Sequence, residues 1–263
     1  MAYVGGGAQE EGCIFCKRLR ADDDVRSLIV HRDRDAFVIM NLFPYNTGHV
    51  MLVPNAHVAS PEEADDDALR AVSALRRPTL RALRRALGCD GFNLGLNVGA
   101  VAGAGVAAHM HEHVVPRWTG DANFMPILAS TMVMPELIPI TYAKLRAELR
   151  RECTQAPPEA VLVILDGDAG HVLVDAATGR LPRMALVENE TVWRRALEAT
   201  AALGITTTLI DWAGEPRAES TSSIAVTLRA EAGAKPIAGM TWVAVDDEDR
   251  MANADRPFMR RAP

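Results

Sequence analysis

Three histidines alternate along the segment Ala108-His109-Met110-His111-Glu112-His113-Val114-Val115-Pro116. Imidazoles can attack electrophiles, exchange protons or bind metals. Successive side chains of a β-strand point to opposite faces, so a strand would project all three to one side, neighbours roughly 6.6 Å apart. A helix would scatter them. A histidine-rich tract or a core histidine is the alternative. Three of the chain's seven histidines gather here, however, which favours a site with several imidazoles on one surface.

A glycine-rich stretch, residues 97–106, precedes the histidines. It has no Lys-Ser or Lys-Thr of a Walker loop, and it lacks the Gly-x-Gly-x-x-Gly spacing of a dinucleotide fingerprint. It predicts a flexible loop whose backbone N–H groups can approach an anion closely. An ordinary Gly/Ala loop is the alternative, and the position beside three imidazoles favours the anion-binding interpretation.

Four cysteines stand at positions 13, 16, 89 and 153. Cys13 and Cys16 are spaced as a redox pair or as half of a metal site. A redox pair would need a thioredoxin-like strand and helix, which the flanking sequence does not predict. A structural zinc site needs four N or S donors, and His57 and His109 are candidates for the other two. Two cysteines buried as small hydrophobic residues are the alternative. Cys89 and Cys153 are predicted to be structural.

Composition limits the class of protein. The 263 residues, with 49% hydrophobic and 24% charged, predict a soluble globular chain of two domains with two cores. No apolar run is long enough for a membrane span, and residues 1–9 lack an export signal, so a cytoplasmic location is expected. The net charge of -6 argues against a nucleic-acid partner. The arginines at 76, 77, 84 and 85 are interpreted as solvated helix faces.

The first domain is expected over residues 1–152, as an α+β unit with a mostly antiparallel sheet and flanking helices. Its predicted strands cover 27–31, 35–41, 49–54 and 92–97, followed by the histidine strand with a turn at Pro116, and the first two form a hairpin. A helix is predicted from an N-cap at Ser60 to Leu87, with a kink at Pro78 and Gly88 at its C-cap. Another is predicted over 137–150.

A linker is expected at 153–158, followed by a smaller α/β domain over 159–263. Its elements are a hairpin (161–165 and 171–175), a helix capped by Asn189 that ends at Gly204, and strands at 205–212 and 223–229. An apolar stripe on that helix, interpreted as core, consists of Trp193, Leu197, Thr200 and Leu203.

Residues 13–151 resemble the histidine triad (HIT) superfamily of nucleotide hydrolases and transferases. The resemblance rests on Cys13-Ile14-Phe15-Cys16, Asn41-Leu42-Phe43-Pro44 with Gly48-His49-Val50-Met51-Leu52-Val53-Pro54, Gly91-Phe92-Asn93-Leu94-Gly95-Leu96-Asn97, and His109 to Arg117. Two stretches are most similar to the bacterial branch that cleaves diadenosine tetraphosphate and its relatives. They are the continuation Arg117-Trp118-Thr119-Gly120-Asp121-Ala122-Asn123-Phe124 and the block Asn41-Leu42-Phe43-Pro44-Tyr45-Asn46.

The resemblance implies roles for residues at the matching positions. His111 would be the nucleophile, with His49 and His113 holding the phosphate and the imidazoles. Asn41 would contact the ribose, and further substrate contacts would come from Asn97, Gly105 and Trp118. In zinc-containing members the ligands fall at the positions of Cys13, Cys16, His57 and His109. Members often pair, so a homodimer or higher homo-oligomer is expected.

Two positions depart from the family pattern. Val106 stands where many members place a Ser or Thr that touches the phosphate, so that contact must come from backbone or be missing. Glu112 replaces an apolar residue inside the triad, and its side chain should point away from the imidazoles. The second domain resembles a Nudix domain, but Ala201 and Ala202 replace the metal-binding glutamates and only Glu198 is retained. A Nudix-like fold without pyrophosphatase activity is therefore expected, with a role in oligomerisation, as a lid or in substrate selection.

The expected function is that of a nucleotidyl hydrolase or nucleotidyltransferase acting on dinucleoside polyphosphates. Imidazole has a pKa near ~6.5, so much of it is unprotonated at neutral pH and can attack phosphorus. His111 would form a nucleotidyl intermediate that water or inorganic phosphate resolves. The alternatives are a nucleoside phosphoramidase, an adenylate-removing enzyme of the same superfamily, or a nucleotide-binding regulator without activity.

Overall fold

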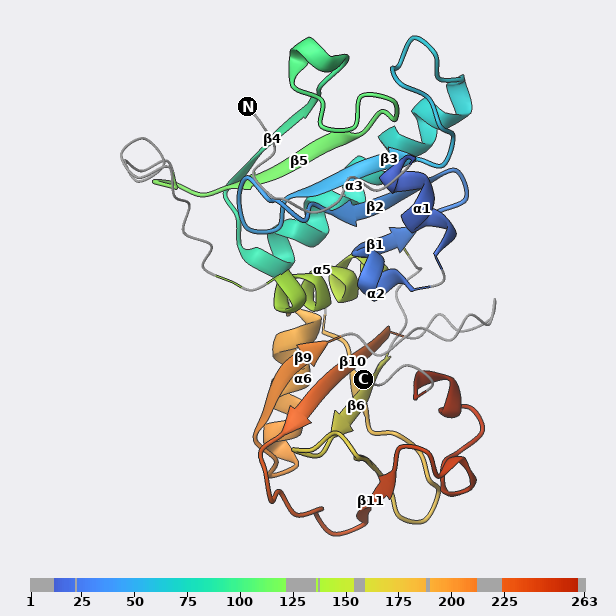
Figure 1. Ribbon diagram of the computed structural model, residues 1–263. Helices are drawn as coiled ribbons and strands as arrows, with labels where there is room; N and C mark the ends of the chain where they lie inside the picture. Colours follow the sequence, from blue (N-terminus) through green and yellow to red (C-terminus); the bar gives the residue numbers. More distant parts are fainter. Residues whose placement is uncertain are drawn as a thin grey trace.

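The computed structural model describes residues 12–21, 23–121, 136, 138–153, 159–187, 190–211 and 224–259. Most of the predicted linker, the motif residues 122–124 and the predicted cap Asn189 lie outside these ranges. Two sheets are stacked end to end, with a long helix between them (Figure 1). In the described part of the chain no helix combines the length and the apolar character needed to cross a membrane.

The N-terminal sheet is antiparallel, as predicted, and has the strand order β1-β2-β3-β5-β4. The predicted hairpin is confirmed, since β1 pairs with β2. The short helices α1 (Ile14–Arg20) and α2 (Asp24–Ser27) precede the sheet. Its strands are β1 (Ile29–Arg32), β2 (Ala36–Met40), β3 (Val50–Pro54), β4 (Gly91–Leu96) and β5 (Glu112–Arg117).

The predicted histidine strand is wrong at both ends. β5 begins only at Glu112, because its partner β3 pairs no further than Leu52 opposite Glu112. The Met110 N–H instead donates to the carbonyl of Val58 in the loop after β3, at 2.7 Å. The predicted turn at Pro116 is also wrong, since β5 continues to Arg117. The Pro116 carbonyl accepts a hydrogen bond from the Asn46 side chain, so the backbone of this residue directs its polar groups away from β4. Proline, which has no N–H, therefore removes no hydrogen bond between β4 and β5.

Helix α3 (Asp66–Leu87) packs on β2 and β3. Its N-cap is Asp65, whose carboxylate accepts from the Ala68 N–H at 2.8 Å, and the predicted cap at Ser60 is wrong. Two cap signals follow each other in the sequence, and the second begins the helix. The helix continues through Pro78 and ends, as predicted, at Gly88, whose φ of 65° suits glycine.

The C-terminal sheet is mixed. Five strands follow the order β11-β7-β6-β10-β9, with β8 beside β6, and β10 runs parallel to β6. The predicted hairpin of β6 and β7 is confirmed, whereas sequence analysis missed β8 and β11. The strands are β6 (Glu159–Leu165), β7 (His171–Asp175), β8 (Arg183–Ala185), β9 (Thr207–Asp211), β10 (Ile224–Ala230) and β11 (Met240–Ala244).

Helix α6 (Val192–Ala202) covers part of this sheet. Its cap is Thr191, which accepts from the Arg194 N–H, so the predicted cap at Asn189 is wrong. The buried residues of the helix are Val192, Ala196 and Thr200, whereas Trp193 and Leu197 of the predicted stripe are half-buried. The Nudix resemblance stays a prediction.

Helix α5 (Ile138–Cys153) joins the two sheets, and the apolar cluster that contains it runs through both of them. Each sheet also contributes to a further cluster of its own, so the two separate cores expected are not what is found. Helix α5 packs against α3 on one side and against β9, β10 and α6 on the other. Its fully buried Glu148 accepts from the Val192 N–H at 2.5 Å and lies 3.1 Å from Arg85 of α3. Arg85 was predicted on a solvated face. It is instead part of the contact between the two halves.

Candidate functional site

His49 is held in the sheet by the residue before it. Gly48 has a φ of +76°, a left-handed conformation that strains any residue with a side chain, and a Cβ there would crowd Leu87 of α3. Only glycine therefore fits between the preceding turn and β3. This packing leaves His49 fully buried directly before β3, which pairs with β5, the strand that carries His113.

Three imidazoles meet at this point. His49 Nε2 lies 2.9 Å from His113 Nδ1, and the rings of His111 and His113 are 4.9 Å apart between centroids. The predicted catalytic set, His49, His111 and His113, is therefore brought together, although His111 precedes the strand. Phe15 of α1 packs its ring 5.0 Å from that of His111.

Hydrogen bonds define which nitrogen of each ring carries the proton. His111 Nδ1 lies 2.8 Å from the His109 carbonyl, which can only accept, so Nδ1 is the protonated nitrogen and Nε2 carries the lone pair. His49 Nδ1 receives the Tyr45 N–H at 3.1 Å, which places the His49 proton on Nε2. That proton points to His113 Nδ1, so His113 carries its own proton on Nε2.

Burial keeps these rings neutral. Desolvation, followed by the neighbouring imidazoles His113 and His111, lowers the pKa of His49 to about 3. Desolvation lowers the pKa of His113 to about 4, with a smaller contribution from His111. Burial also lowers the pKa of His111, against the hydrogen bond to the His109 carbonyl. The site therefore presents one unprotonated nitrogen next to one N–H donor at neutral pH.

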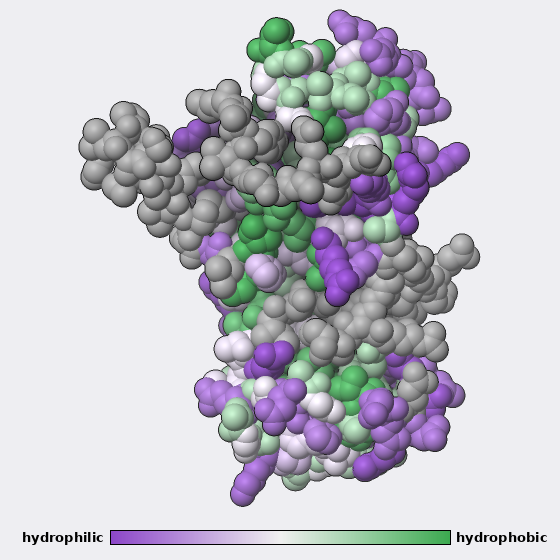
Figure 2. Space-filling view, in the orientation of Figure 1, coloured by the Kyte–Doolittle hydropathy of each residue, from purple (hydrophilic) through white to green (hydrophobic). Residues whose placement is uncertain are grey.

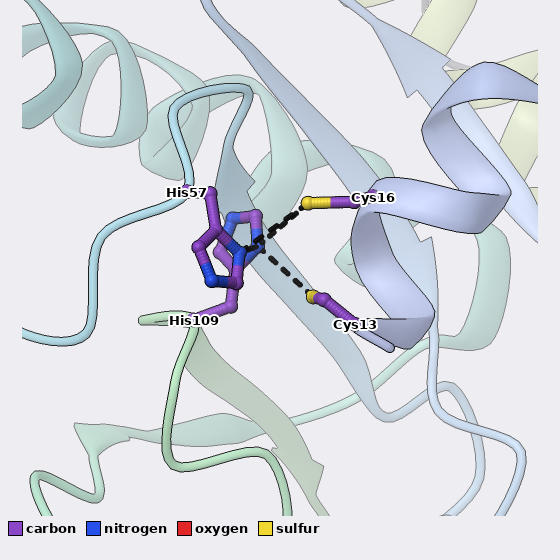
Figure 3. A group of neighbouring side chains, drawn as sticks. All are labelled: Cys13, Cys16, His57 and His109. Atoms are coloured by element: carbon purple, nitrogen blue, oxygen red, sulfur yellow. Dashed lines mark hydrogen bonds between the residues drawn. The ribbon is translucent and has the colours of Figure 1, made fainter. Parts of the chain in front are cut away.

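A second cluster lies beside the first and consists of the predicted metal ligands Cys13, Cys16, His57 and His109 (Figure 3). Their ligand atoms all lie within 4.8 Å of one another. His109 Nδ1 is 3.3 Å from Cys13 Sγ, 3.6 Å from Cys16 Sγ and 3.3 Å from His57 Nδ1. Tetrahedral zinc with Zn–N of ~2.0 Å and Zn–S of ~2.3 Å would separate its ligands by roughly 3.3–3.7 Å. The donor set therefore fits zinc.

The comparisons with known proteins concern this half of the chain. The HIT domain family model matches residues 23–120. An uncharacterized HIT-like protein of Methanocaldococcus jannaschii is 35% identical over 111 residues, which are 42% of this chain and 83% of that protein. The chain belongs to the HIT family.

Other HIT relatives carry more specific names. AP-4-A phosphorylase of Mycobacterium tuberculosis is 39% identical over 129 residues, 49% of this chain and 66% of that protein. The chain thus spans slightly less than two thirds of that relative's length. Among solved structures, a Zn-bound histidine triad family protein from Mycobacterium smegmatis matches with a TM-score of 0.45 and 26% identity, over 53% of this chain and 94% of that one.

The other predicted positions of the HIT site lie in the segments that follow β2, β4 and β5. Asn41 places its Nδ2 3.3 Å from His49 Nδ1, while its Oδ1 accepts from the Phe43 N–H. Asn97 is half-buried just after β4, and Gly105 is exposed in the glycine-rich loop. Trp118 is half-buried directly after β5. The glycine-rich loop contains the 3-10 turn η1 (Ala100–Ala102), and its exposed valines are Val98 and Val101. Apolar surface gathers at the top of the molecule in the view of Figure 2.

Two residues depart from the HIT pattern. Val106 packs against the apolar cluster around Phe15. Glu112 points away from the imidazoles, as predicted, and pairs with Arg76 of α3 at 2.8 Å. Arg76 is therefore an ion-pair partner and not simply part of a solvated face.

Sequence analysis missed the role of Tyr45. Besides donating its N–H, this residue stacks its ring 4.7 Å from His49 and 5.8 Å from His113. The signal available was its place in the turn before Gly48, inside a block already assigned to the HIT resemblance. Phe15, between the two cysteines, was missed in the same way.

Proposed function

We propose that this HIT protein is a nucleotidyl hydrolase or nucleotidyltransferase that cleaves dinucleoside polyphosphates, with diadenosine tetraphosphate as the representative substrate. The observation that carries the proposal is the lone pair on His111 Nε2 beside the N–H of His113. A nucleophile next to a hydrogen-bond donor suits attack on a phosphoryl group whose oxygens gain negative charge. The similarity to AP-4-A phosphorylase supports the choice of substrate.

In the first step His111 Nε2 forms a bond to phosphorus as the bond from that phosphorus to the bridging oxygen breaks. The electron pair of the broken bond leaves on the terminal phosphate oxygen of the departing nucleotide. The imidazole becomes cationic because Nδ1 keeps its proton on the His109 carbonyl. His113 Nε2–H donates to a non-bridging oxygen of the attacked phosphate, and His49 holds His113 in that tautomer.

In the second step an oxygen of water or of inorganic phosphate attacks the same phosphorus. The N–P bond breaks, its electron pair returns to Nε2, and the proton of the acceptor is released to solvent. We assign further substrate contacts to backbone N–H groups near Gly105 and to the predicted positions Asn41, Asn97 and Trp118, since Val106 has no hydroxyl to offer.

We propose a structural zinc ion held by Cys13, Cys16, His57 and His109. With four protein ligands, zinc would fix the chain without activating water. His109 Nε2 lies 2.9 Å from the Pro54 carbonyl, which orients Nδ1 toward the two sulfurs. The same residue offers its carbonyl to His111, so the metal cluster would hold the nucleophile in place.

The test is incubation of the protein with diadenosine tetraphosphate, with and without inorganic phosphate, followed by product analysis. ATP plus AMP indicates hydrolysis, and ATP plus ADP formed only with phosphate indicates a phosphorylase. The variant His111→Gln is the control for contaminating activity. Binding without products would overturn the catalytic proposal in favour of a regulator. Turnover only of nucleoside phosphoramidates or of adenylylated compounds would overturn the substrate class.

A further inference from the structure

Asp121, which lies four residues beyond β5, binds several groups at once. Its carboxylate accepts two hydrogen bonds from Arg117, at 2.7 and 2.6 Å, and one from the Trp118 N–H at 3.0 Å. The same Oδ2 accepts from Asn46 Nδ2 at 3.0 Å. Asn46 belongs to the turn that precedes His49, 75 residues away in sequence. Asp121 thus ties the end of β5 to the turn before β3.

Asn46 is the second part of this connection. Its Nδ2 also donates to the Pro116 carbonyl at 3.1 Å, so it is bound to β5 at two points. Its Oδ1 accepts from the Thr47 N–H, and its backbone carbonyl accepts from the His49 N–H at 3.1 Å. The side chain therefore fixes the position of the whole turn relative to β5, which carries His113.

The neighbouring residue in this turn is Tyr45, whose N–H makes the shorter of the two contacts that hold His49 Nδ1 as an acceptor, at 3.1 Å against 3.3 Å for Asn41 Nδ2. If the Tyr45 N–H moved away, only the longer contact to Asn41 Nδ2 would hold this tautomer, and His49 could carry its proton on Nδ1 and present a lone pair at Nε2. His113 would then protonate its Nδ1 to preserve the 2.9 Å contact, and its own Nε2 would become an acceptor. An acceptor facing a phosphoryl oxygen repels it, so the position of Tyr45 bears directly on the chemistry.

We infer that Asn46 and Asp121 are positioning residues that maintain the proton arrangement of His49 and His113 through the Tyr45 N–H. The inference rests on the proposed function for its catalytic consequence. The proton arrangement itself belongs to the free protein and can be measured without any substrate.

The direct test is NMR of protein labelled with ¹⁵N in histidine, of which the chain has seven. His49→Gln and His113→Gln assign the two rings. In the parent both rings should show a single Nε2–H tautomer. In Asn46→Ala the ring nitrogen shifts of both should move toward a mixture of tautomers. Asn46→Ser is the second variant, should the alanine variant unfold.

The matched control is Asp90→Asn. The Asp90 carboxylate accepts from the Thr119 N–H at 2.7 Å, so it supports the same turn as Asp121 without contacting Asn46. This control should keep the parent tautomers. Parent-like tautomers in folded Asn46→Ala, or an equal change in Asp90→Asn, would overturn the inference.

The second part of the test measures kcat and KM of the variants with diadenosine tetraphosphate as the substrate. Asn46→Ala and Asp121→Asn should each lower kcat about tenfold with KM changed less than about twofold, because the donor acts on charge that develops in the transition state. Since both act through one connection, the double variant should be no slower than the slower single variant. A double variant whose loss of kcat equals the product of the two single losses would contradict a common connection. If the parent has no turnover, the proposed function fails while the NMR result still decides the inference.

Discussion

Two imidazoles only two residues apart present opposite ring nitrogens. His109 Nε2 is occupied by the Pro54 carbonyl, which leaves Nδ1 facing Cys13 and Cys16. His111 Nδ1 is occupied by the His109 carbonyl, which leaves Nε2 with its lone pair. In each case a backbone carbonyl selects the nitrogen. The residue type alone therefore does not decide whether a histidine binds a metal or attacks a substrate.

The two clusters also differ in whether a ring nitrogen is left without a protein partner. Around His109 two thiols and two imidazoles form the four-donor set proposed for zinc, whereas His111 keeps one nitrogen without a protein partner among the contacts of the described residues. They share the His109 peptide and Phe15, whose ring contacts both His109, at 5.4 Å between centroids, and His111. The metal cluster is expected to support the catalytic cluster mechanically, and the following predictions test that division of roles.

The largest expected effect is that of His111→Gln on turnover. Removing the nucleophile should reduce kcat by at least about a thousandfold, since the remaining groups can only bind and polarise the substrate. Zinc content, measured by elemental analysis, should equal that of the parent. A variant that retains more than a tenth of parental kcat would show that the attacking group lies elsewhere.

Removing the metal cluster should act mainly on stability. Cys13→Ser is expected to lose zinc and to lower Tm by about 10 °C, because metal binding contributes directly to folding free energy. Turnover should fall about tenfold, less than for His111→Gln, because the catalytic rings remain but the His109 carbonyl is less well placed.

Cys153→Ser is the matched control for the metal prediction. Cys153 is half-buried on α5, and burial raises the pKa of its thiol to about 11. It lies outside the Cys13, Cys16, His57 and His109 cluster, so the variant should keep its zinc. Equal zinc content and equal Tm in Cys13→Ser and the parent would show that Cys13 does not hold a structural metal ion.

Acidification should destabilise the fold through its neutral histidines. Burial lowers the pKa of His49 to about 3 and of His113 and His31 to about 4, all below the ordinary ~6.5. Between these values the unfolded chain binds protons that the folded chain does not, so stability is complete above pH ~6.5 and falls as pH decreases.

At pH ~5.5 each of these imidazoles should lower the free energy of unfolding by about 1 kcal/mol relative to its value above pH ~6.5. Denaturant unfolding from pH 8 to 4.5 measures this loss, and Asp121, with a pKa of about 2, titrates outside that window. His31→Gln should flatten the pH dependence without affecting the triad. An unchanged slope in that variant would contradict the assignment.

The local signals in the sequence were sufficient for most of the N-terminal half. Short runs rich in Val, Ile and Phe predicted β1 and β2, and the segment 49–54 predicted β3. The cluster of Cys13, Cys16, His57 and His109 followed from spacing and resemblance. The start of β5 could not be predicted, because it depends on where the partner strand β3 stops pairing. The Ser60 cap failed for a similar reason: Asp65 offered the same signal five residues later.

Other features arise only from tertiary contacts. The tautomers depend on the backbone groups of His109, Tyr45 and Pro54, which are chemically the same in every sequence. The continuous core depends on α5 burying both of its faces, which the periodicity of residues 137–150 did not distinguish from an ordinary terminal helix. Residue patterns therefore predicted which side chains meet, but not which atoms of those side chains face each other.

The smallest expected effect is that of Glu112→Gln, inside the histidine segment. Glu112 is 3% exposed but points to α3, where it pairs with Arg76. Because Arg76 stays partly solvated, loss of the charge should cost about 1 kcal/mol of stability and leave kcat within twofold. Glu152→Gln, which breaks contacts to Arg81 and Arg85 of the same helix, is the control. A tenfold lower kcat at unchanged Tm in Glu112→Gln would show that alternation along β5 does not separate catalytic from structural side chains.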